Sequence, residues 1–597
     1  MKGAATMRWI VFAALLVTGL AAAWSMELRY SKDLLWGYRP LLCFMSIWLA
    51  IAVVLFPNPF KNQAGARYFW WPIFGGLLLA FSFPPTFLPV LAMAGFVPIL
   101  LLSDPDLKLT NRFGQRTAVA FHTFMIWNIA ATFWVANTAL IAGVFAIVVN
   151  SLLMLVPWVL FLLVRNRVGL FKAGIILLAF WLSFEFLHHR WELTWPWLTL
   201  GNALSGLPIL AQWYEYTGTA GGSIWILGAN WWLYKAIKRG MQGYHDSYRN
   251  LLMFRFLPWL LIPAVFSLYL YAQPGPEAED TVKTAVIQPN FEPHYEKFDI
   301  PYSQQLDRIL GLVRQSLEDG AEIVVLPETS VRVRLHEGLS DQSLAALTTI
   351  MSDWPDAYLI AGLSSNYIFP SAEEADPAFL REHIRAPGDT IFWESHNSAA
   401  VINKDGLVDI YYKSKLVPGA EIFPFRRLLF FLEPIVNMLG GSTSGLRTQA
   451  ERSAFLTEKY GLAPVICYES VFGEFHQGYF DARARAILIK TNDGWWDNTP
   501  GHIQHLYIGA LRAIEFRKEI ARSANTGISG FIDTKGRIRK PTAYEETAVV
   551  IDYLELNSHR TFYSRTGDYL SRIALLLSIG FFLLIPVETV RRKTKTR

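Results

Sequence analysis

The sequence predicts a polytopic α-helical membrane protein that carries a layered α/β domain outside the cytoplasm. Of its 597 residues, 52% are hydrophobic and only 17% are charged, whereas soluble chains carry about 25% charged residues. Long apolar runs fill the chain before residue 279 and return once after residue 566; between them charges, turns and short apolar segments alternate. We therefore expect a membrane domain over 1–278, a globular domain over 279–566, and a transmembrane helix with a basic tail over 567–597.

Ten apolar runs are candidate transmembrane helices, since about 20 apolar residues cross about 30 Å of hydrocarbon. They are 9–26, 41–56, 69–83, 87–102, 117–142, 145–164, 170–187, 218–234, 254–271 and 569–587. The two runs that flank Pro84 and Pro85 predict a tight helical hairpin. The first run follows Lys2 and Arg8, so a cleaved signal peptide is an alternative to the uncleaved span that we favour.

Positive charges in the loops orient these spans. If the N-terminus is cytoplasmic, the inside segments hold 20 Lys and Arg residues, and the outside loops hold four, Arg29, Lys32, Arg39 and Arg190. Nine spans from an inside start place the globular domain outside the cytoplasm. The net charge of +5 is thus mainly a topology signal, and no basic stripe indicates a nucleic-acid partner.

Two features inside the membrane part call for an explanation. Glu185 lies within a predicted span, where placing an ionisable group costs free energy. We expect it to form a structural hydrogen bond to a neighbouring helix rather than to contact a substrate. The aromatic segments 195–198 and 213–216 predict an interfacial belt that anchors the protein in lipid.

The globular region reads as strands alternating with helices. The clearest strands are 284–288, 322–326, 358–362, 399–402, 463–467, 486–491 and 529–532, and helical patterns cover 302–318, 343–352 and 501–517. Such alternation indicates sheets covered by helices. The region is long enough for a full hydrophobic core.

Three of these segments end in residues with unusual chemistry. Glu328 follows an apolar strand, Lys413 precedes a proline, and Cys467 ends another apolar strand. A free thiol has a pKa of ~8.5, so it needs a base such as Glu328 to become a nucleophile. A cation and a backbone N–H, here Lys413 and the amide of Tyr468, suit the oxyanion that its attack creates. Taken singly, the three are as easily a helix cap, a surface lysine and a core cysteine.

Other chemistries fit the sequence less well. The two cysteines, Cys43 and Cys467, lie in different parts of the chain, so neither a disulfide nor a zinc site is expected, and Cys43 reads as a core residue. No G-x-S-x-G motif supports a serine hydrolase, since the nearest stretch, 441–445, has threonine at the nucleophile position. His502 and His505 lack an acidic partner at metal-binding spacing, so we expect no metal and no cofactor.

In order along the chain, Leu326-Pro-Glu, Tyr411-Tyr-Lys ahead of Leu416-Val-Pro, and Ile466-Cys-Tyr-Glu resemble the Glu-Lys-Cys triad of the nitrilase superfamily. With helices on both flanks, the chain resembles the apolipoprotein N-acyltransferase family. Further similar segments are 195–201, 492–496, 504–505, 512–515 and 522–527. The resemblance runs from about residue 65 to the end, so the first two spans look additional to the family's eight helices.

This resemblance implies an αββα sandwich that faces the periplasm from a multi-pass protein of the cell inner membrane. It also implies the transfer of an acyl chain from a phospholipid to the diacylglyceryl-cysteine amine of a lipoprotein. Cys467, activated by Glu328, would form the thioester, and Lys413 would stabilise the oxyanion. The partners would be phospholipid, the lipoprotein acceptor and membrane lipid, with a monomer favoured.

The resemblance also suggests supporting residues. Glu421, Tyr468 and Glu469 match residues that support the triad, and Phe298, Asn397 and Trp195 are possible substrate contacts. The family's Leu-Val-Pro-Phe-Gly-Glu reads Leu-Val-Pro-Gly-Ala-Glu over 416–421, and Phe298 replaces a family tryptophan. The apolar segments 423–425 and 428–432 are either an arm that dips into lipid or a core helix.

Two other functions stay open from the sequence. One is a membrane-anchored amidase or phospholipase of the nitrilase type, although one helix would suffice as an anchor. The other is an inactive scaffold that binds lipid or lipoprotein, although the triad residue types and Glu421 are all retained.

Overall fold

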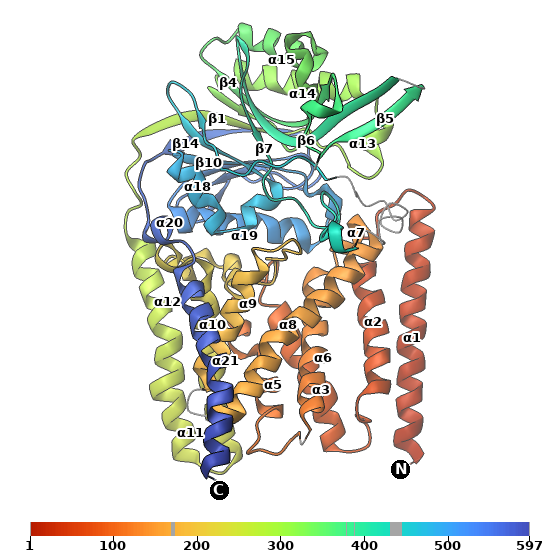
Figure 1. The fold of residues 1–597 in the computed structure, drawn as a ribbon, viewed down its shortest axis with the longest axis vertical. Coiled ribbons are helices and arrows are strands. Elements are labelled where there is room, and N and C mark those ends of the chain that lie inside the picture. The colour runs from red at the N-terminus through yellow and green to blue at the C-terminus, as the bar shows by residue number, and fades with distance from the viewer. Residues whose placement is uncertain are drawn as a thin grey trace.

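The computed structural model describes residues 2–110, 112–168, 173–377, 379–386, 389–429 and 445–595. A helical bundle forms one end of the molecule, and stacked β-sheets with covering helices form the other (Figure 1). Helix α1 (Lys2–Tyr30) begins, and helix α21 (Tyr569–Lys595) ends, at the end of the bundle away from the sheets (Figure 1). Most of the 441–445 stretch, residues 430–432 of the apolar arm, Lys172 and the last two tail residues lie outside the described residues.

The bundle contains the predicted helices with two differences. The other helices before the sheets are α2 (Arg39–Leu55), α3 (Gln63–Ala80), α4 (Ala92–Gly95), α5 (Val97–Leu102), α6 (Phe113–Thr132), α7 (Val135–Thr138), α8 (Leu140–Val168), α9 (Ala173–His188), α10 (Tyr214–Met241), α11 (His245–Leu251) and α12 (Leu257–Ala272). The run 87–102 is not one helix but a short turn followed by α4 and α5, consistent with prolines at 89 and 98 that cannot donate to a preceding turn. The run 117–142 is interrupted by extended backbone at Ala139.

Three described helical segments are long and apolar enough to cross a membrane: Gly3–Tyr30, Leu140–Arg165 and His245–Ala272. Four shorter apolar helical segments accompany them, Arg39–Leu55, Pro89–Leu102, Ala173–His188 and Tyr569–Leu583. The expectation of ten spans therefore has three clear candidates among the described residues, and the other spans stay predictions.

Glu185 holds the bundle together as expected. Its carboxylate is 6% exposed and accepts hydrogen bonds from the Trp181 indole (3.0 Å), the Leu200 backbone N–H (2.9 Å) and the Ser223 hydroxyl (2.7 Å). Ser223 belongs to α10, whereas Glu185 belongs to α9. The predicted hydrogen bond to a neighbouring helix is confirmed. All three donors belong to the bundle itself, so these contacts give Glu185 a structural role.

The predicted aromatic belt stays a prediction, although two of its tryptophans are buried within the protein. Trp197 and Trp213 are only 2% and 7% exposed, whereas Tyr216 is 40% exposed. Trp197 packs against Trp134 and Trp496, with ring centroids 5.0 and 5.5 Å apart. Since Trp496 belongs to the sheet domain, these rings join the two parts of the molecule.

The sheet domain contains two packed sheets. The first has the order β14 (Ala548–Leu556), β1 (Asp280–Gln288), β2 (Ile323–Val325), β4 (Tyr358–Phe369), β6 (Asp389–Asn403) and β5 (Arg381–Ala386), with β3 (Val331–Arg334) beside β4 and β7 (Gly406–Tyr412) beside β6. The second has the order β13 (Ile538–Arg539), β12 (Gly530–Ile532), β11 (Ile520–Ala524), β10 (Ala486–Thr491), β9 (Gly461–Ile466) and β8 (Phe455–Leu456). The strands at the centre of each sheet are parallel.

Alternating side chains divide the domain into four layers. On β2, Ile323 and Val325 face the second sheet, whereas Val324 packs with α14 (Tyr302–Glu318) and α15 (Gln342–Ser352). The far face of the second sheet packs against α18 (Gln477–Asp481) and α19 (Pro500–Phe516). The expected αββα sandwich is therefore present, and α19 lies between the sheets and the bundle (Figure 1).

Polar contacts fasten the domain to the bundle. The buried guanidinium of Arg517 donates to the Glu215 carboxylate (2.7 Å), the Gln212 side-chain oxygen (2.7 Å) and two backbone carbonyls. The loop between α1 and α2 also reaches the domain, where the Gly37 N–H donates to Asp497 Oδ2 (2.9 Å). The first two helices therefore touch the same domain loop that carries Trp496.

We predict that Arg517→Met lowers the midpoint of thermal unfolding by roughly 2–8 °C, because removing one partner of a buried ion pair costs about 3–5 kcal/mol and a chain of this size shifts by about 1–2 °C per kcal/mol. The matched control is Arg537→Met, since the Arg537 side chain is 62% exposed and pairs with Asp533 at the surface. Differential scanning fluorimetry in detergent measures both. Equal midpoints for the two variants would contradict the role of Arg517 as a buried fastener.

Candidate active site

The structure brings Glu328, Lys413 and Cys467 together. Lys413 Nζ donates to Glu328 Oε1 (2.8 Å) and to Glu421 Oε1 (2.9 Å). The Cys467 thiol lies close enough to Glu328 for the two groups to shift each other's pKa. The three residues are 7%, 1% and 8% exposed, respectively. A base, a cation and a thiol thus share one buried site, although they are far apart in the sequence.

The backbone at the strand ends aims these side chains. Glu328 follows β2 and precedes Thr329, which has φ +49°, and Cys467 directly follows β9 with φ +45°. Positive φ at a non-glycine residue costs roughly 1–3 kcal/mol and is concentrated at active sites. Gly362 is required where β4 passes the first turn, because a Cβ there would lie 2.1 Å from the Pro327 carbonyl oxygen. The turns after β2 and β9 therefore keep these backbone conformations because the neighbouring strands pack around them.

Glu421 is the second carboxylate that binds Lys413, and Asn397 bridges Glu421 and Glu328. The Asn397 side-chain N–H groups donate to Glu328 Oε1 (2.7 Å) and Glu421 Oε1 (3.0 Å), which leaves its buried Oδ1 without a partner among the described residues. Glu421 Oε2 accepts from the Val417 N–H (2.8 Å) across a turn with Gly419 at φ +84°. The loop that departs from the family pattern therefore still delivers Glu421 to Lys413.

Glu469 and Tyr468 have structural contacts. Glu469 is fully buried, and its carboxylate accepts from the Tyr411 hydroxyl (2.8 Å), the Ser414 N–H (2.7 Å) and the Ile466 N–H (2.9 Å). It therefore joins the segment after β7 to the end of β9. The Tyr468 hydroxyl donates to the Thr194 carbonyl oxygen of the bundle (2.8 Å).

Behind Cys467 lies a buried polar network that the sequence did not predict. The Thr491 hydroxyl lies 3.3 Å from Cys467 Sγ and 2.7 Å from Asp493 Oδ1. Asp493 also pairs with His505 Nδ1 (2.8 Å) and with Arg522. All four residues are at most 1% exposed. Segments 492–496 and 522–527, which contain Asp493 and Arg522, resemble the family in sequence, but only the fold shows that these two residues meet.

Charges within the site set its protonation. Burial alone would raise the pKa of Glu328, but the charge and hydrogen bond of Lys413 outweigh it, so the pKa of this carboxyl lies below its usual value. Burial opposes the charge of Lys413, yet Glu328 and Glu421 hold the pKa of the ammonium well above its usual value. Burial and the negative charge of Glu328 raise the pKa of the Cys467 thiol well above its usual value. The resting site therefore holds a thiol, an ammonium and a carboxylate.

The expected substrate contacts differ in their surroundings. Phe298 lies in α13 (Glu296–Asp299), but its side chain falls outside the described structure. Trp195 packs in a hydrophobic cluster that also contains Tyr468 and Val417. Its indole N–H has no hydrogen-bond partner among the described residues. Of the predicted apolar arm, Phe423 is buried and Leu428 is 72% exposed, so its two interpretations both remain.

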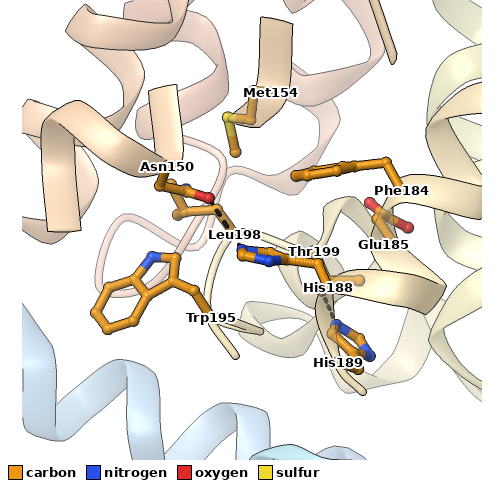
Figure 2. A pocket seen from close by; sticks show the side chains of 9 residues that line it. All are labelled: Asn150, Met154, Phe184, Glu185, His188, His189, Trp195, Leu198 and Thr199. Atoms are coloured by element: carbon orange, nitrogen blue, oxygen red, sulfur yellow. Dashed lines mark hydrogen bonds between the residues drawn. The ribbon is translucent and has the colours of Figure 1, made fainter. Parts of the chain in front are cut away.

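A small cavity lies in the bundle next to Trp195 (Figure 2). Its volume of about 10 Å³ is room for about one water molecule. The lining side chains are Asn150, Met154, Phe184, Glu185, His188, His189, Trp195, Leu198 and Thr199. It is therefore too small for an acyl chain and does not form the substrate site.

Comparisons with known proteins agree with this arrangement. The family model described as apolipoprotein N-acyltransferase N-terminal domain matches residues 75–238, and the carbon-nitrogen hydrolase model matches residues 283–562. An apolipoprotein N-acyltransferase of Chlorobaculum tepidum is 28% identical over 85% of this chain and 95% of its own. That of Geobacter metallireducens is also 28% identical, over 84% of this chain and 92% of its own. The chain belongs to the apolipoprotein N-acyltransferase family.

Among solved structures, an amidase from Nesterenkonia sp. aligns with a TM-score of 0.33 and 15% identity, covering 49% of this chain and 95% of the amidase.

The match to the N-terminal family model begins at residue 75. Helices α1 and α2 therefore precede the matched region.

We predict that Lys413→Met makes stability fall as pH rises. Without the ammonium, Glu328 and Glu421 share Asn397 as like charges in a buried site, so a carboxyl pKa rises above the unfolded value of about 4.3. A raised folded pKa stabilises the protein below the unfolded value, and this stabilisation is lost as pH rises through the folded value. Thermal unfolding midpoints between pH 5 and 8 measure the effect.

The control for this prediction is the double variant Glu328→Gln with Lys413→Met, which removes one carboxylate as well. It should recover the pH dependence of the wild type. A Lys413→Met protein whose midpoint follows the same pH curve as the wild type would show that the ammonium does not balance the two carboxylates.

Proposed function

We propose that this protein is an apolipoprotein N-acyltransferase that moves an acyl chain from a phospholipid to the N-terminal diacylglyceryl-cysteine amine of a lipoprotein. The observation that carries this proposal is the buried Glu328-Lys413-Cys467 cluster in a chain with both family domains. The residue after the nucleophile, Tyr468, bonds directly to the helical bundle. The nucleophile thus lies beside the part of the protein that would face lipid.

In the first half-reaction, Cys467 Sγ attacks the ester carbonyl carbon of the phospholipid, and Glu328 takes the thiol proton. This transfer is needed because the thiol is protonated at rest. Lys413, held between Glu328 and Glu421, stabilises the negative oxygen of the intermediate. The C–O bond then breaks, Glu328 returns the proton to the leaving oxygen, and a lysophospholipid departs from the thioester.

In the second half-reaction, the lipoprotein amine attacks the thioester carbonyl. Glu328 accepts a proton from the amine nitrogen, the C–S bond breaks, and the Cys467 thiolate regains that proton from Glu328. Asn397 Oδ1, which is buried and unpartnered among the described residues, is suited to accept a hydrogen bond from the incoming amine. Glu421 keeps Lys413 in place while Glu328 changes charge.

We further propose a multi-pass placement in the cell inner membrane, with the sheet domain (279–566) facing the periplasm between a membrane domain (1–278) and a C-terminal helix with a basic tail (567–597). The excess of positive charge in the inside segments supports this orientation. The start of α1 and the end of α21 at the far end of the bundle fit it (Figure 1). Helices α1 and α2 would be additions to the family core.

The test is mass spectrometry of lipoprotein N-termini in cells depleted of their own N-acyltransferase. Wild-type protein should restore N-acylated termini. Cys467→Ser should leave free amines, because serine at this site lacks the thiol nucleophile. Cys43→Ser is the matched control and should behave like the wild type, since Cys43 packs among helices α1 and α2.

Two results would contradict the proposal. Free N-termini in the presence of a folded wild-type protein would exclude N-acyl transfer. Release of lysophospholipid and free fatty acid without an acylated amine would mean that water resolves the thioester and that the protein is a phospholipase.

A further inference from the structure

The hydroxyl of Thr491 lies between two acceptors but has one proton. It lies 3.3 Å from Cys467 Sγ and 2.7 Å from Asp493 Oδ1. A hydroxyl donates one hydrogen bond at a time, and a carboxylate attracts that donation more strongly than a neutral thiol does. In the resting site the thiol is protonated, because burial and the negative charge of Glu328 raise its pKa well above the usual value. Thr491 therefore donates to Asp493 until the sulfur becomes negative.

Asp493 does not need Thr491 to remain satisfied. Its Oδ1 also accepts from His505 Nδ1 (2.8 Å), and its Oδ2 accepts from Arg522. Burial alone would raise the pKa of Asp493, but the charge of Arg522 and the bond to His505 hold it well below its usual value. The carboxylate thus stays ionised and bonded when the Thr491 proton turns away.

The strand geometry keeps Thr491 within reach of the sulfur. Thr491 ends β10, Cys467 directly follows β9, and these strands are parallel neighbours with Lys490 opposite Ile466. Thr491 is fully buried, so no bulk water competes for its hydroxyl. Only a rotation about one side-chain bond separates the two acceptors.

We propose that Thr491 is a catalytic residue whose hydroxyl turns from Asp493 to Cys467 Sγ whenever the thiolate forms. This role rests on the proposed acyl transfer and adds a donor to both half-reactions. As Glu328 removes the thiol proton, Thr491 stabilises the attacking sulfur. When the amine expels the sulfur, Thr491 stabilises the leaving thiolate until Glu328 returns a proton. The hydroxyl proton itself is never transferred.

Other charges also act on this thiol, so the effect of Thr491 must be separated from theirs. Glu328 and Asp493 raise the pKa of Cys467, whereas Lys413 and the Thr491 hydrogen bond lower it. The groups that face the sulfur or its partners are Glu328, Lys413, Glu421, Glu469, Lys490, Asp493, His505 and Arg522. A variant that changes only the hydroxyl of Thr491 leaves all of them in place.

The test compares Thr491→Val, which is nearly isosteric but lacks the hydroxyl, with Thr491→Ser, which keeps it. Both are made in a Cys43→Ser background, so that iodoacetamide reports on Cys467 alone. Thr491→Val should shift the pH profile of alkylation to higher pH and slow thioester formation by about 10- to 100-fold, the effect of losing a hydrogen bond to a charged group. Thr491→Ser should follow the wild type in both measurements.

Thermal unfolding verifies that each variant folds. An unshifted alkylation profile in Thr491→Val would overturn the proposal, as would a Thr491→Ser protein as slow as Thr491→Val, since the methyl group would then be what matters. If the profile shifts but no phospholipid acylates the wild type, Thr491 acts on the thiol as proposed, and the acyl-transfer function fails instead.

Discussion

The buried ammonium of Lys413 is the group on which the rest of the site depends. An isolated charge in a protein interior costs many kcal/mol, so it persists only where opposite charges and hydrogen bonds surround it. Here Glu328 and Glu421 both bind Lys413, and Asn397 bridges the same two carboxylates. The segments after β2 and β7 must therefore lie side by side, because they supply Glu328, Lys413 and Glu421. The same arrangement leaves a carboxylate and an ammonium beside the Cys467 thiol, which are the groups that the proposed mechanism uses.

The contact between the sheet domain and the bundle places this chemistry. Tyr468 reaches the bundle through Thr194, and Trp134, Trp197 and Trp496 form one aromatic cluster across the junction. Under the proposed acyl transfer, this junction keeps the nucleophile next to the helical bundle.

Much of the fold could be predicted from the sequence, because helices and buried strands leave runs of apolar residues that can be recognised without knowing their neighbours in space. Apolar runs predicted the helices and most of the central strands, and the residues at three strand ends pointed to Glu328, Lys413 and Cys467. The central strand β11 was missed, because Arg522 and Ser523 interrupt its apolar run. The edge strand β14 was missed because its residues are mostly half-exposed, so it lacks a buried apolar run. The burial of Trp197 and Trp213 was not predicted, because tryptophans that face lipid and tryptophans that face another domain look alike in sequence. Thr491, Asp493, His505 and Arg522 meet only through neighbouring strand ends and a covering helix, which no local spacing encodes.

Whether Cys467 carries the acyl group can be read from the peptide masses of the protein after it meets a phospholipid. The full-length protein is incubated with a phospholipid of defined acyl chains, without acceptor, and then digested. We expect one added acyl group on the peptide that contains Cys467. Neutral hydroxylamine should remove this group, as it does a thioester, and the group should be absent in Cys467→Ser. An unmodified Cys467 peptide, or an acyl group that resists hydroxylamine on another residue, would contradict this expectation.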